Sequence, residues 1–257
     1  MLSQHVLQVA GVSKCFGGLQ ALNDVHLNIE RGQVYGLIGP NGAGKTTFFN
    51  VITGLYPADS GNFVLADQPY QPKDVHLVAK AGIARTFQNI RLFADMTALE
   101  NVMVARHVRT HSGLLGAIFR TKSFTQEEKE IAERAHELLA YVGIDTLADV
   151  KARTLSYGDQ RRLEIARALA TDPQLLALDE PAAGMNATEK VQLRELIDKI
   201  RHDQRTVLLI EHDVKLVMGL CDRVTVLDEG QVIAECTPAH VQRDARVMQA
   251  YLGTAQV

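Results

Sequence analysis

The sequence predicts an α/β fold with a buried, largely parallel sheet, an antiparallel β edge and an inserted α-helical subdomain. A short apolar strand at 33–38 runs into a glycine-rich loop and then into a helix with an apolar face. Two later strands, at 175–179 and 206–210, are nearly continuous apolar runs, as strands covered on both faces are. Before them, residues 90–150 change to helical periodicity. Strands that alternate with helices, interrupted by one helical segment, explain all three observations.

Size and composition fit a globular protein that can bury a full core. The chain has 257 residues, of which 46% are hydrophobic and 22% charged. Its formal net charge of −3 provides no basic field, so nucleic acid is not an expected partner. Three cysteines without metal or redox spacing, Cys15, Cys221 and Cys236, are expected to be free thiols in a reducing compartment.

The sequence shows neither a membrane span nor a secretory signal. A transmembrane helix needs ~20 apolar residues, and no run approaches that length. The first residues lack a charged segment followed by an apolar one. We therefore expect a cytosolic protein whose association with a membrane comes through a partner.

The first elements are predicted to be strands and turns. Residues 5–9 and 25–29 alternate apolar and polar positions, as half-exposed strands do. Phe16 lies between them, followed by two glycines, and is expected in a loop. It is either part of the core or an aromatic surface on which an adenine ring stacks.

The glycine-rich loop matches the nucleotide-phosphate pattern G-x-x-x-x-G-K-[ST] at every fixed position. Its members are Gly39, Pro40, Asn41, Gly42, Ala43, Gly44, Lys45, Thr46 and Thr47. Glycines let backbone N–H groups turn toward a triphosphate, and the following helix contributes its positive end. Lys45 is predicted to reach the β/γ-phosphates and the Thr46 hydroxyl to bind Mg²⁺. A plain glycine-rich turn is the alternative, which the strand-loop-helix context disfavours.

The next segments are a short helix at 77–83 and a strand-like run, 83–89, that ends in the polar pair Gln88 and Asn89. Gln88 is unremarkable in isolation. Two capping boxes then predict helix starts: Thr97 with Glu100, and Thr125 with Glu128. Between these helices lies an insert, residues 106–124, with a six-residue apolar run at 114–119. That run is too short to span a membrane and is interpreted as an exposed insert or contact element.

The second half contains three polar clusters, each placed at the end of an element. Ser156, with Gly158 two residues later, opens a helix, which is either a plain N-cap or an anion-binding turn. Asp179 and Glu180 end the strand at 175–179, where a Mg²⁺ ligand and a general base would lie beside a bound nucleotide. His212 follows the strand at 206–210.

The last elements are predicted from capping and turn signals. Asn186 and Glu189 cap a further helix, and a hairpin follows across the turn at 228–230. Pro238 then begins a helical tail whose last helix follows Asp244.

In this order and at these intervals, the phosphate loop, Gln88, the stretch 155–160, Asp179–Glu180 and His212 resemble the ATP-binding subunit of ABC transporters. The resemblance covers the whole chain. It implies a single domain, 1–257, with the P-loop NTPase (RecA-like) core of the ABC ATPase fold. The catalytic lobe would comprise about 1–88 and 160–257, and the helical subdomain about 89–159.

The resemblance also implies a role for each site residue, with ATP and Mg²⁺ as cofactors. The roles are Phe16 for adenine, Lys45 and Thr46 for phosphate and Mg²⁺, Gln88 for the attacking water and the metal, Asp179 for Mg²⁺, Glu180 as base, His212 for the γ-phosphate, and Ser156 and Gly158 for the ATP of a partner subunit. The site is then composite, and a monomer is half an enzyme.

Three positions depart from the common family pattern: Tyr157 and Asp159 in the serine-glycine stretch, and Asn186 where an aspartate is common. Together with the stretch 85–93, the 106–124 insert and the tail ending at Gly253, they resemble an ATPase subunit of branched-chain amino-acid importers. Importers of urea or amides are also similar, and so, more distantly, is the lipopolysaccharide-export ATPase.

The implied partners are a second ATPase subunit in a head-to-tail homo- or heterodimer and membrane permeases contacted near residues 87–103. A substrate-binding protein is an indirect partner, and the location is the cytoplasmic face of the inner membrane. A soluble ABC ATPase of translation or DNA repair is the alternative, although such proteins usually carry two cassettes or long coiled coils. A phosphate-loop kinase would have no use for Ser156 and His212.

Overall fold

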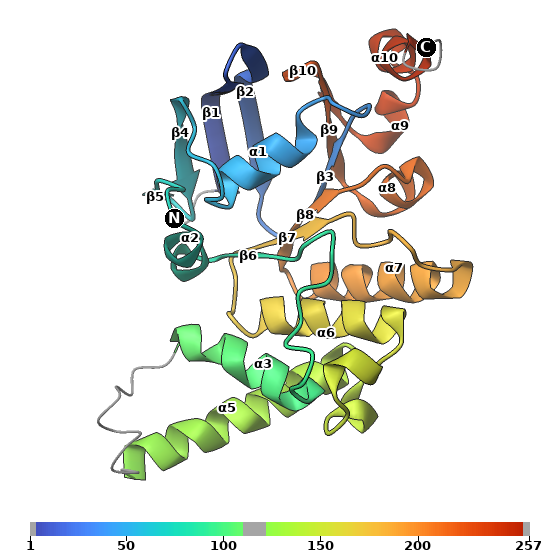
Figure 1. Cartoon of the computed structure of the whole chain (residues 1–257). Helices are drawn as coiled ribbons and strands as arrows, with labels where there is room; N and C mark the ends of the chain where they lie inside the picture. The colour runs from blue at the N-terminus through green and yellow to red at the C-terminus, as the bar shows by residue number, and fades with distance from the viewer. Residues whose placement is uncertain (1–3, 110–121, 254–257) are drawn as a thin grey trace.

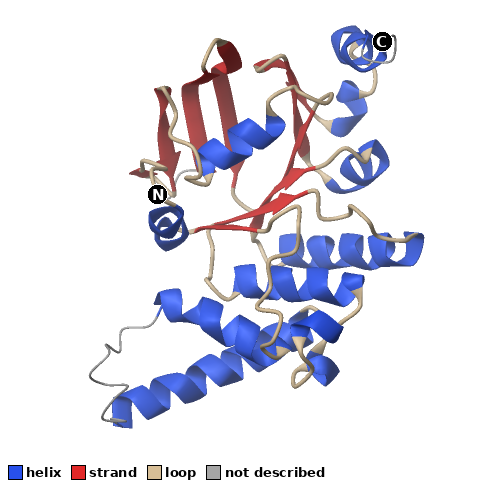
Figure 2. Cartoon of the chain, viewed as in Figure 1, coloured by secondary structure: helices blue, strands red, loops and turns tan. Residues whose placement is uncertain are grey.

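The computed structural model describes residues 4–109 and 122–253. Two β-sheets face each other across helix α1 (Lys45–Ile52), and the remaining helices lie mostly beyond the larger sheet (Figures 1 and 2). This layered α/β arrangement is the one that the sequence predicts.

The larger sheet has six strands and is parallel except at one edge. In spatial order its strands are β10 (Gln231–Cys236), β9 (Arg223–Asp228), β3 (Val34–Ile38), β8 (Thr206–Ile210), β7 (Leu175–Asp179) and β6 (Ile83–Arg85). Strands β9 and β10 form the predicted hairpin, and β10 is the antiparallel strand. Every residue of β3, β7 and β8 is buried, because helices or the second sheet cover both faces.

The antiparallel strands form a sheet of their own. Its spatial order is β2 (Leu19–Glu30), β1 (His5–Phe16), β4 (Ser60–Leu65) and β5 (Gln68–Pro69). The loop predicted around Phe16 is wrong, because Phe16 is the last residue of β1 and pairs with Leu19. A two-residue glycine turn, with Gly17 at φ 58°, lets the strands continue to the end of the hairpin.

The predicted helices are present: besides α1 they are α2 (Val75–Ala81), α3 (Ala98–Arg106), α5 (Lys122–Tyr141), α6 (Tyr157–Leu169), α7 (Ala187–His202), α9 (Pro238–Val241) and α10 (Ala245–Gly253). Helix α8 (Val214–Leu220) was not predicted. Short 3₁₀ turns occur at His107–Arg109, Asp145–Leu147 and Ala152–Thr154.

Helix caps test the sequence signals directly. The capping boxes Thr97–Glu100 and Asn186–Glu189 are confirmed with both hydrogen bonds. The start predicted at Thr125 is wrong, because α5 begins at Lys122 and Thr125 lies within the helix. Thr125 and Glu128 have the spacing of a capping box, but the helix begins before them, at Lys122. The apolar run 114–119 lies outside the described residues.

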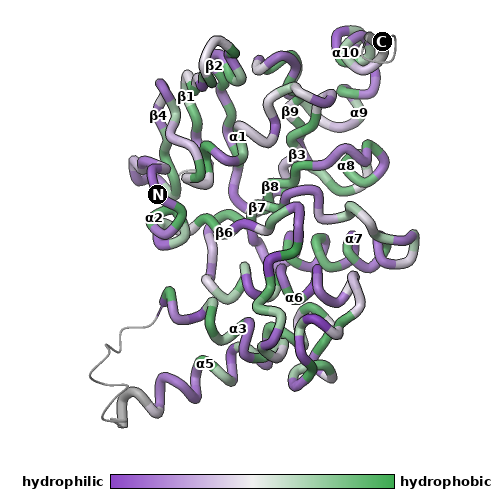
Figure 3. Tube along the Cα trace, viewed as in Figure 1, coloured by the Kyte–Doolittle hydropathy of each residue, from purple (hydrophilic) through white to green (hydrophobic). Residues whose placement is uncertain are grey.

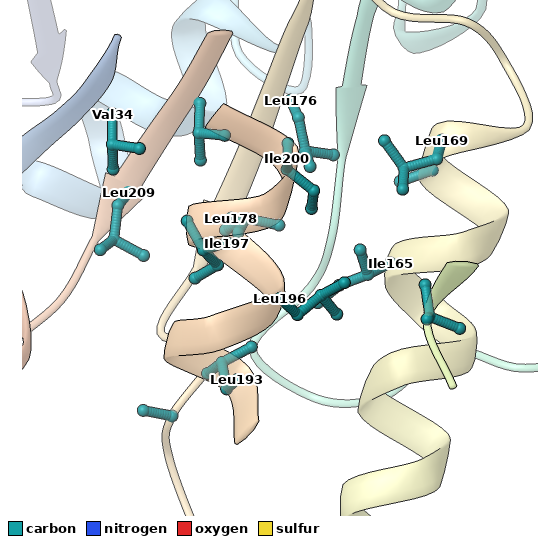
Figure 4. Packing of buried hydrophobic residues seen from close by; sticks show 14 of the residues in the cluster. Val34, Ile165, Leu169, Leu176, Leu178, Leu193, Leu196, Ile197, Ile200 and Leu209 are labelled. Atoms are coloured by element: carbon teal, nitrogen blue, oxygen red, sulfur yellow. The ribbon is translucent and has the colours of Figure 1, made fainter. Parts of the chain in front are cut away.

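Two hydrophobic clusters hold the layers together, one on each face of the larger sheet. Along β3 the side chains alternate, since Val34 and Ile38 join the cluster with α6 and α7 whereas Tyr35 and Leu37 join the cluster with α1. Figure 4 shows the first cluster, where leucines and isoleucines of α6 and α7 pack on β7 and β8. Helices α3 and α5 pack against α6. Figure 3 shows hydrophilic residues predominating toward the N-terminal end of α5.

Two further expectations from the sequence concern the cysteines and membrane-spanning helices. Cys15, Cys221 and Cys236 are free, as expected. Among the helices in the described part of the chain, none is both long and apolar enough to cross a bilayer.

Parallel strands bring the predicted polar residues to one edge. The carboxyl ends of β3, β7 and β8 lie side by side in the sheet. They lead respectively into the phosphate loop at Gly39, into Glu180 and into Glu211. The topology therefore builds one site from three distant parts of the sequence.

Candidate active site

The phosphate loop joins β3 to α1 in a conformation that glycine permits. Gly39 and Gly44 have φ angles of 152° and 98°. A Cβ atom on Gly39 would lie 2.1 Å from the Leu227 carbonyl oxygen, and one on Gly44 would lie 2.6 Å from that of Ala21. Any side chain at these two positions would displace backbone, so the packing itself requires glycine.

The Lys45 side chain links the end of the phosphate loop to its beginning by hydrogen bonds. Its Nζ donates to the carbonyl oxygens of Gly39 and Pro40 at 2.7 and 2.8 Å. Burial lowers the pKa of Lys45, and the negative charge of Glu180 opposes that shift. The ammonium is thus held at the first residue of α1, where the N-terminal N–H groups and the helix dipole also favour an anion.

A cavity of about 630 Å³ opens over this loop, within the usual size range of ligand pockets. Its lining includes Phe16, the loop from Asn41 to Thr47, Glu180 and Glu229. The Phe16 ring is 41% exposed and packs edge-to-face on Tyr56, with 5.2 Å between the ring centroids. An apolar ring at one end and a phosphate-binding loop at the other match the two ends of a nucleotide.

Asp179, at the end of β7, is buried and pairs with a buried arginine. The distance from its Oδ2 to Arg85 Nη2 is 3.7 Å. Burial raises the pKa of Asp179, and Arg85 acts in the opposite direction. The Arg85 guanidinium stacks near the rings of Phe49 and Phe87, and burial lowers its pKa to about 10. Sequence reasoning missed Arg85, which only its contacts identify.

Glu180 is the point where three elements meet. Its backbone has a φ of 45°, an uncommon value for a residue with a side chain and one that is often found at functional sites. Gln88 Nε2 donates to Glu180 Oε2 at 2.9 Å, and His212 Nδ1 lies 3.7 Å from the same oxygen. The structure therefore brings together Gln88, Glu180 and His212, which the sequence places 92 and 32 residues apart.

Glu211 is a second residue that sequence reasoning left without a role. It is 1% exposed and accepts the N–H of Ala182 at 2.9 Å, that of His212 at 3.2 Å and that of Asp213 at 3.4 Å. Burial raises its pKa. The sequence signal that could have identified Glu211 is its position directly after a buried apolar strand. Its carboxylate joins the loop that follows Glu180 to the turn that carries His212.

Ser156 and Gly158 lie elsewhere, at the start of α6. Ser156 is the N-cap, as its spacing predicts, and accepts the N–H of Asp159 at 3.2 Å. Its hydroxyl donates to the Asp159 carboxylate at 2.6 Å. Neither Ser156 nor Gly158 is among the described residues that line the cavity. Within one chain the structure therefore assembles the nucleotide cavity and the Glu180 cluster, and leaves the serine-glycine turn outside.

Comparison with known protein families agrees with a nucleotide-binding site of this kind. Residues 22–183 match the family model described as "ABC transporter". The chain belongs to the family of ABC transporter ATP-binding proteins. Residues 231–257 match a second model, described as "Branched-chain amino acid ATP-binding cassette transporter".

Individual relatives give the same result over the whole length. The chain is 46% identical over 255 residues to the high-affinity branched-chain amino acid transport ATP-binding protein LivG of Escherichia coli strain K12, covering 99% of this chain and 100% of LivG. Among solved structures, an ATP-binding cassette of an ABC transporter in its ADP conformation is 32% identical with a TM-score of 0.84, covering 98% of this chain and 100% of that one. A dimeric post-hydrolysis state of a cassette bound to ADP and Pi is 27% identical with a TM-score of 0.75, covering 90% and 98%.

The ABC subunit described here is therefore an ATPase, and its nucleotide is ATP. Hydrolysis of ATP by this subunit is coupled to transport. The alternative of a soluble ABC ATPase in translation or DNA repair is not favoured, because the similar proteins are transport ATPases over essentially their full length.

Proposed function

We propose that this subunit drives the import of branched-chain amino acids by hydrolysing ATP at the interface of a dimer. The observation that carries the choice of substrate is the C-terminal segment, 231–257, together with full-length similarity to LivG. Residues 231–253 of this segment include β10, α9 and α10, which lie far from the phosphate loop in sequence. It therefore adds information that the nucleotide site does not contain.

The proposed reaction uses the contacts around Glu180. The Glu180 carboxylate accepts a proton from water as that water attacks the γ-phosphorus of ATP, the bond from this phosphorus to the β–γ bridging oxygen breaks, and ADP leaves. Gln88, whose amide donates to Glu180, orients the water, and His212, which lies near the same Glu180 oxygen, binds the γ-phosphate. Lys45 and the loop N–H groups stabilise the charge on the phosphate oxygens, and Phe16 stacks on adenine.

Mg²⁺ fits the donors that the chain offers. No group of three or more His, Cys, Asp or Glu among the described residues could hold a metal alone. A magnesium ion shared with nucleotide phosphates needs fewer protein ligands, and Thr46, Gln88 and Asp179 offer a hydroxyl, an amide oxygen and a carboxylate. When bound, Mg²⁺ would neutralise charge on the β- and γ-phosphates.

A second subunit is proposed to complete the site. Ser156 is exposed at the N-terminus of α6, and neither Ser156 nor the buried Gly158 lines the cavity of its own chain, so this turn would contact ATP held by a partner in a head-to-tail dimer. The dimeric cassette that resembles this chain supports that assembly.

The permease contact is proposed at the boundary between the catalytic lobe (1–88 and 160–257) and the helical subdomain (89–159). An apolar cavity of about 230 Å³ lies there, lined in part by Phe87, Arg91, Ala105, Val108 and Arg167. A permease segment docked there would touch the segment that carries Gln88. The subunit would then sit peripherally at the cytoplasmic face of the inner membrane, with a substrate-binding protein on the other side.

The test is reconstitution of the subunit with the permeases that co-purify with it in mild detergent. We expect the associated binding protein to stimulate ATP hydrolysis when loaded with leucine, isoleucine or valine. Stimulation by urea or an amide instead would refute the branched-chain assignment. Co-purification of ribosomes or DNA in place of permeases would refute the transport role.

A further inference from the structure

Helix α6 connects the serine-glycine turn to the loop that follows Glu180. Tyr157 and Arg161 are four residues apart and so share one helix face. The Tyr157 hydroxyl donates to the Ala183 carbonyl oxygen at 2.9 Å, and Arg161 Nη2 donates to the Tyr157 hydroxyl oxygen at 3.2 Å. A side chain next to Ser156 thereby holds the loop at 181–186.

Arg161 also holds the segment that carries Gln88. It is 2% exposed, donates to the carbonyl oxygens of Phe87, at 2.6 Å, and Gln88, and pairs with Glu164 at 2.9 Å. Glu164 in turn accepts the Phe87 N–H at 3.2 Å. Burying this ion pair carries a large desolvation cost. The same burial raises the pKa of Glu164. The proposed reaction assigns no task to Tyr157, Arg161 or Glu164.

We propose that Tyr157 and Arg161 are positioning residues that couple the serine-glycine turn to the Glu180 site of the same subunit. This inference rests on the proposed function, in which Ser156 contacts the ATP of the partner. When that ATP engages Ser156, the N-terminus of α6 shifts. Tyr157 passes the shift to the 181–186 loop, and Arg161 passes it to Gln88. ATP in one site thereby adjusts the general base of the other.

A purely structural role makes a different prediction. If these contacts only stabilised the fold, their removal would lower the melting temperature while the folded enzyme kept its kcat and its cooperativity toward ATP. Coupling predicts a lower kcat with little change in KM, because the nucleotide cavity is not touched. It also predicts that the Hill coefficient for ATP falls toward 1.

The experiment measures steady-state ATP hydrolysis by the full-length subunit at saturating Mg²⁺. Tyr157→Phe removes both hydrogen bonds of the hydroxyl and keeps the ring, so we expect kcat to fall about tenfold and KM to stay within about twofold. Arg161→Lys keeps a charge beside Glu164 but lacks the planar two-nitrogen fork with which Arg161 reaches the Phe87 and Gln88 carbonyl oxygens and the Tyr157 hydroxyl, and should behave alike.

Two matched controls undergo the same atomic changes away from the site. Tyr141→Phe loses a hydroxyl bond to Asp203, and Arg194→Lys loses a bond to the Gly219 carbonyl oxygen. Both should keep the kinetics of the wild type. A melting curve for each variant separates loss of fold from loss of coupling.

A double-mutant cycle tests whether Arg161 acts through Gln88. In a Gln88→Ala background, Arg161→Lys should change kcat less than about twofold, whereas independent effects would multiply. Multiplying effects, or a folded Tyr157→Phe variant with the kcat and Hill coefficient of an active wild type, would overturn the coupling alone. A wild type that hydrolyses no ATP would overturn the proposed function and the coupling together.

Discussion

At the scale of single residues, the site depends on groups held in uncommon states. Glu180 adopts a left-handed backbone conformation that places its carboxylate between Gln88 and His212. Lys45 is buried with a lowered pKa, and Asp179 is buried beside Arg85 with a raised one. Asp159, which departs from the common family pattern, accepts a hydrogen bond from the hydroxyl of Ser156. The backbone of Glu180 and the burial of Lys45 and Asp179 cost free energy, which is typical of functional sites.

The residue-scale prediction concerns Glu180. Glu180→Gln keeps the size of the side chain and removes its ability to accept a proton. We expect kcat for ATP hydrolysis to fall ~10²–10⁴-fold. Binding of ATP, measured by calorimetry, should persist. Glu195→Gln, an exposed acid on α7, is the control and should leave kcat unchanged. Hydrolysis at the wild-type rate by the Glu180 variant would remove Glu180 as the base.

At the scale of elements, buried carboxylates join loops that the sheet alone leaves independent. Glu211 accepts three backbone N–H groups from two loops, and Glu164 fixes the segment after β6 to α6. The sequence around Glu211 and Glu164 does not predict that they are buried, because a buried acid differs from an exposed one only in its three-dimensional neighbours. The positions of the loops relative to one another in this site therefore depend on side-chain contacts, whereas the positions of the strands depend on backbone hydrogen bonds.

The element-scale prediction is a pH dependence caused by Glu211. Because burial raises its folded-state pKa, the folded protein keeps this proton at pH values where the unfolded chain, near 4.5, has lost it. The stability that protonation provides is present below the unfolded pKa and is lost as pH rises through the folded pKa.

Glu211→Gln cannot titrate, so its stability relative to the wild type should increase as pH rises through that interval. Denaturant unfolding of both proteins between about pH 4 and 7 measures the difference. A difference that is constant with pH would show that Glu211 titrates normally.

At the scale of the whole molecule, the chain assembles one nucleotide cavity and presents the serine-glycine turn outside it. The two features lie on different elements, Ser156 before α6 and Lys45 at the start of α1. The proposed composite site of two head-to-tail subunits would use both. The prediction at this scale is complementation between inactive subunits.

Lys45→Ala removes the phosphate-binding ammonium from the cavity of its own chain, and Ser156→Arg blocks the site of the partner, so each variant alone should be inactive. An equimolar mixture contains dimers with one intact composite site, and hydrolysis should reappear at a fraction of the wild-type rate. Coupled-enzyme assay of phosphate release measures it. If both variants fold and their mixture stays inactive, two copies of this chain do not share a site.

The sequence by itself determined the strands, most helix starts and the phosphate loop, because period, capping residues and glycine spacing are local properties of the chain. Resemblance to a family added the roles of Phe16, Gln88, Ser156 and His212. Local signals failed at Phe16, where a two-glycine turn extended the strand, and at Thr125, where a capping pattern lay within a helix.

Only the tertiary structure decided which side chains meet Glu180, how Arg85 and Glu211 are buried, and that Tyr157 and Arg161 reach two loops at once. These facts depend on contacts between residues far apart in sequence. No local pattern encodes them, because they arise when parallel strands bring their carboxyl ends to one edge and α6 packs beside it.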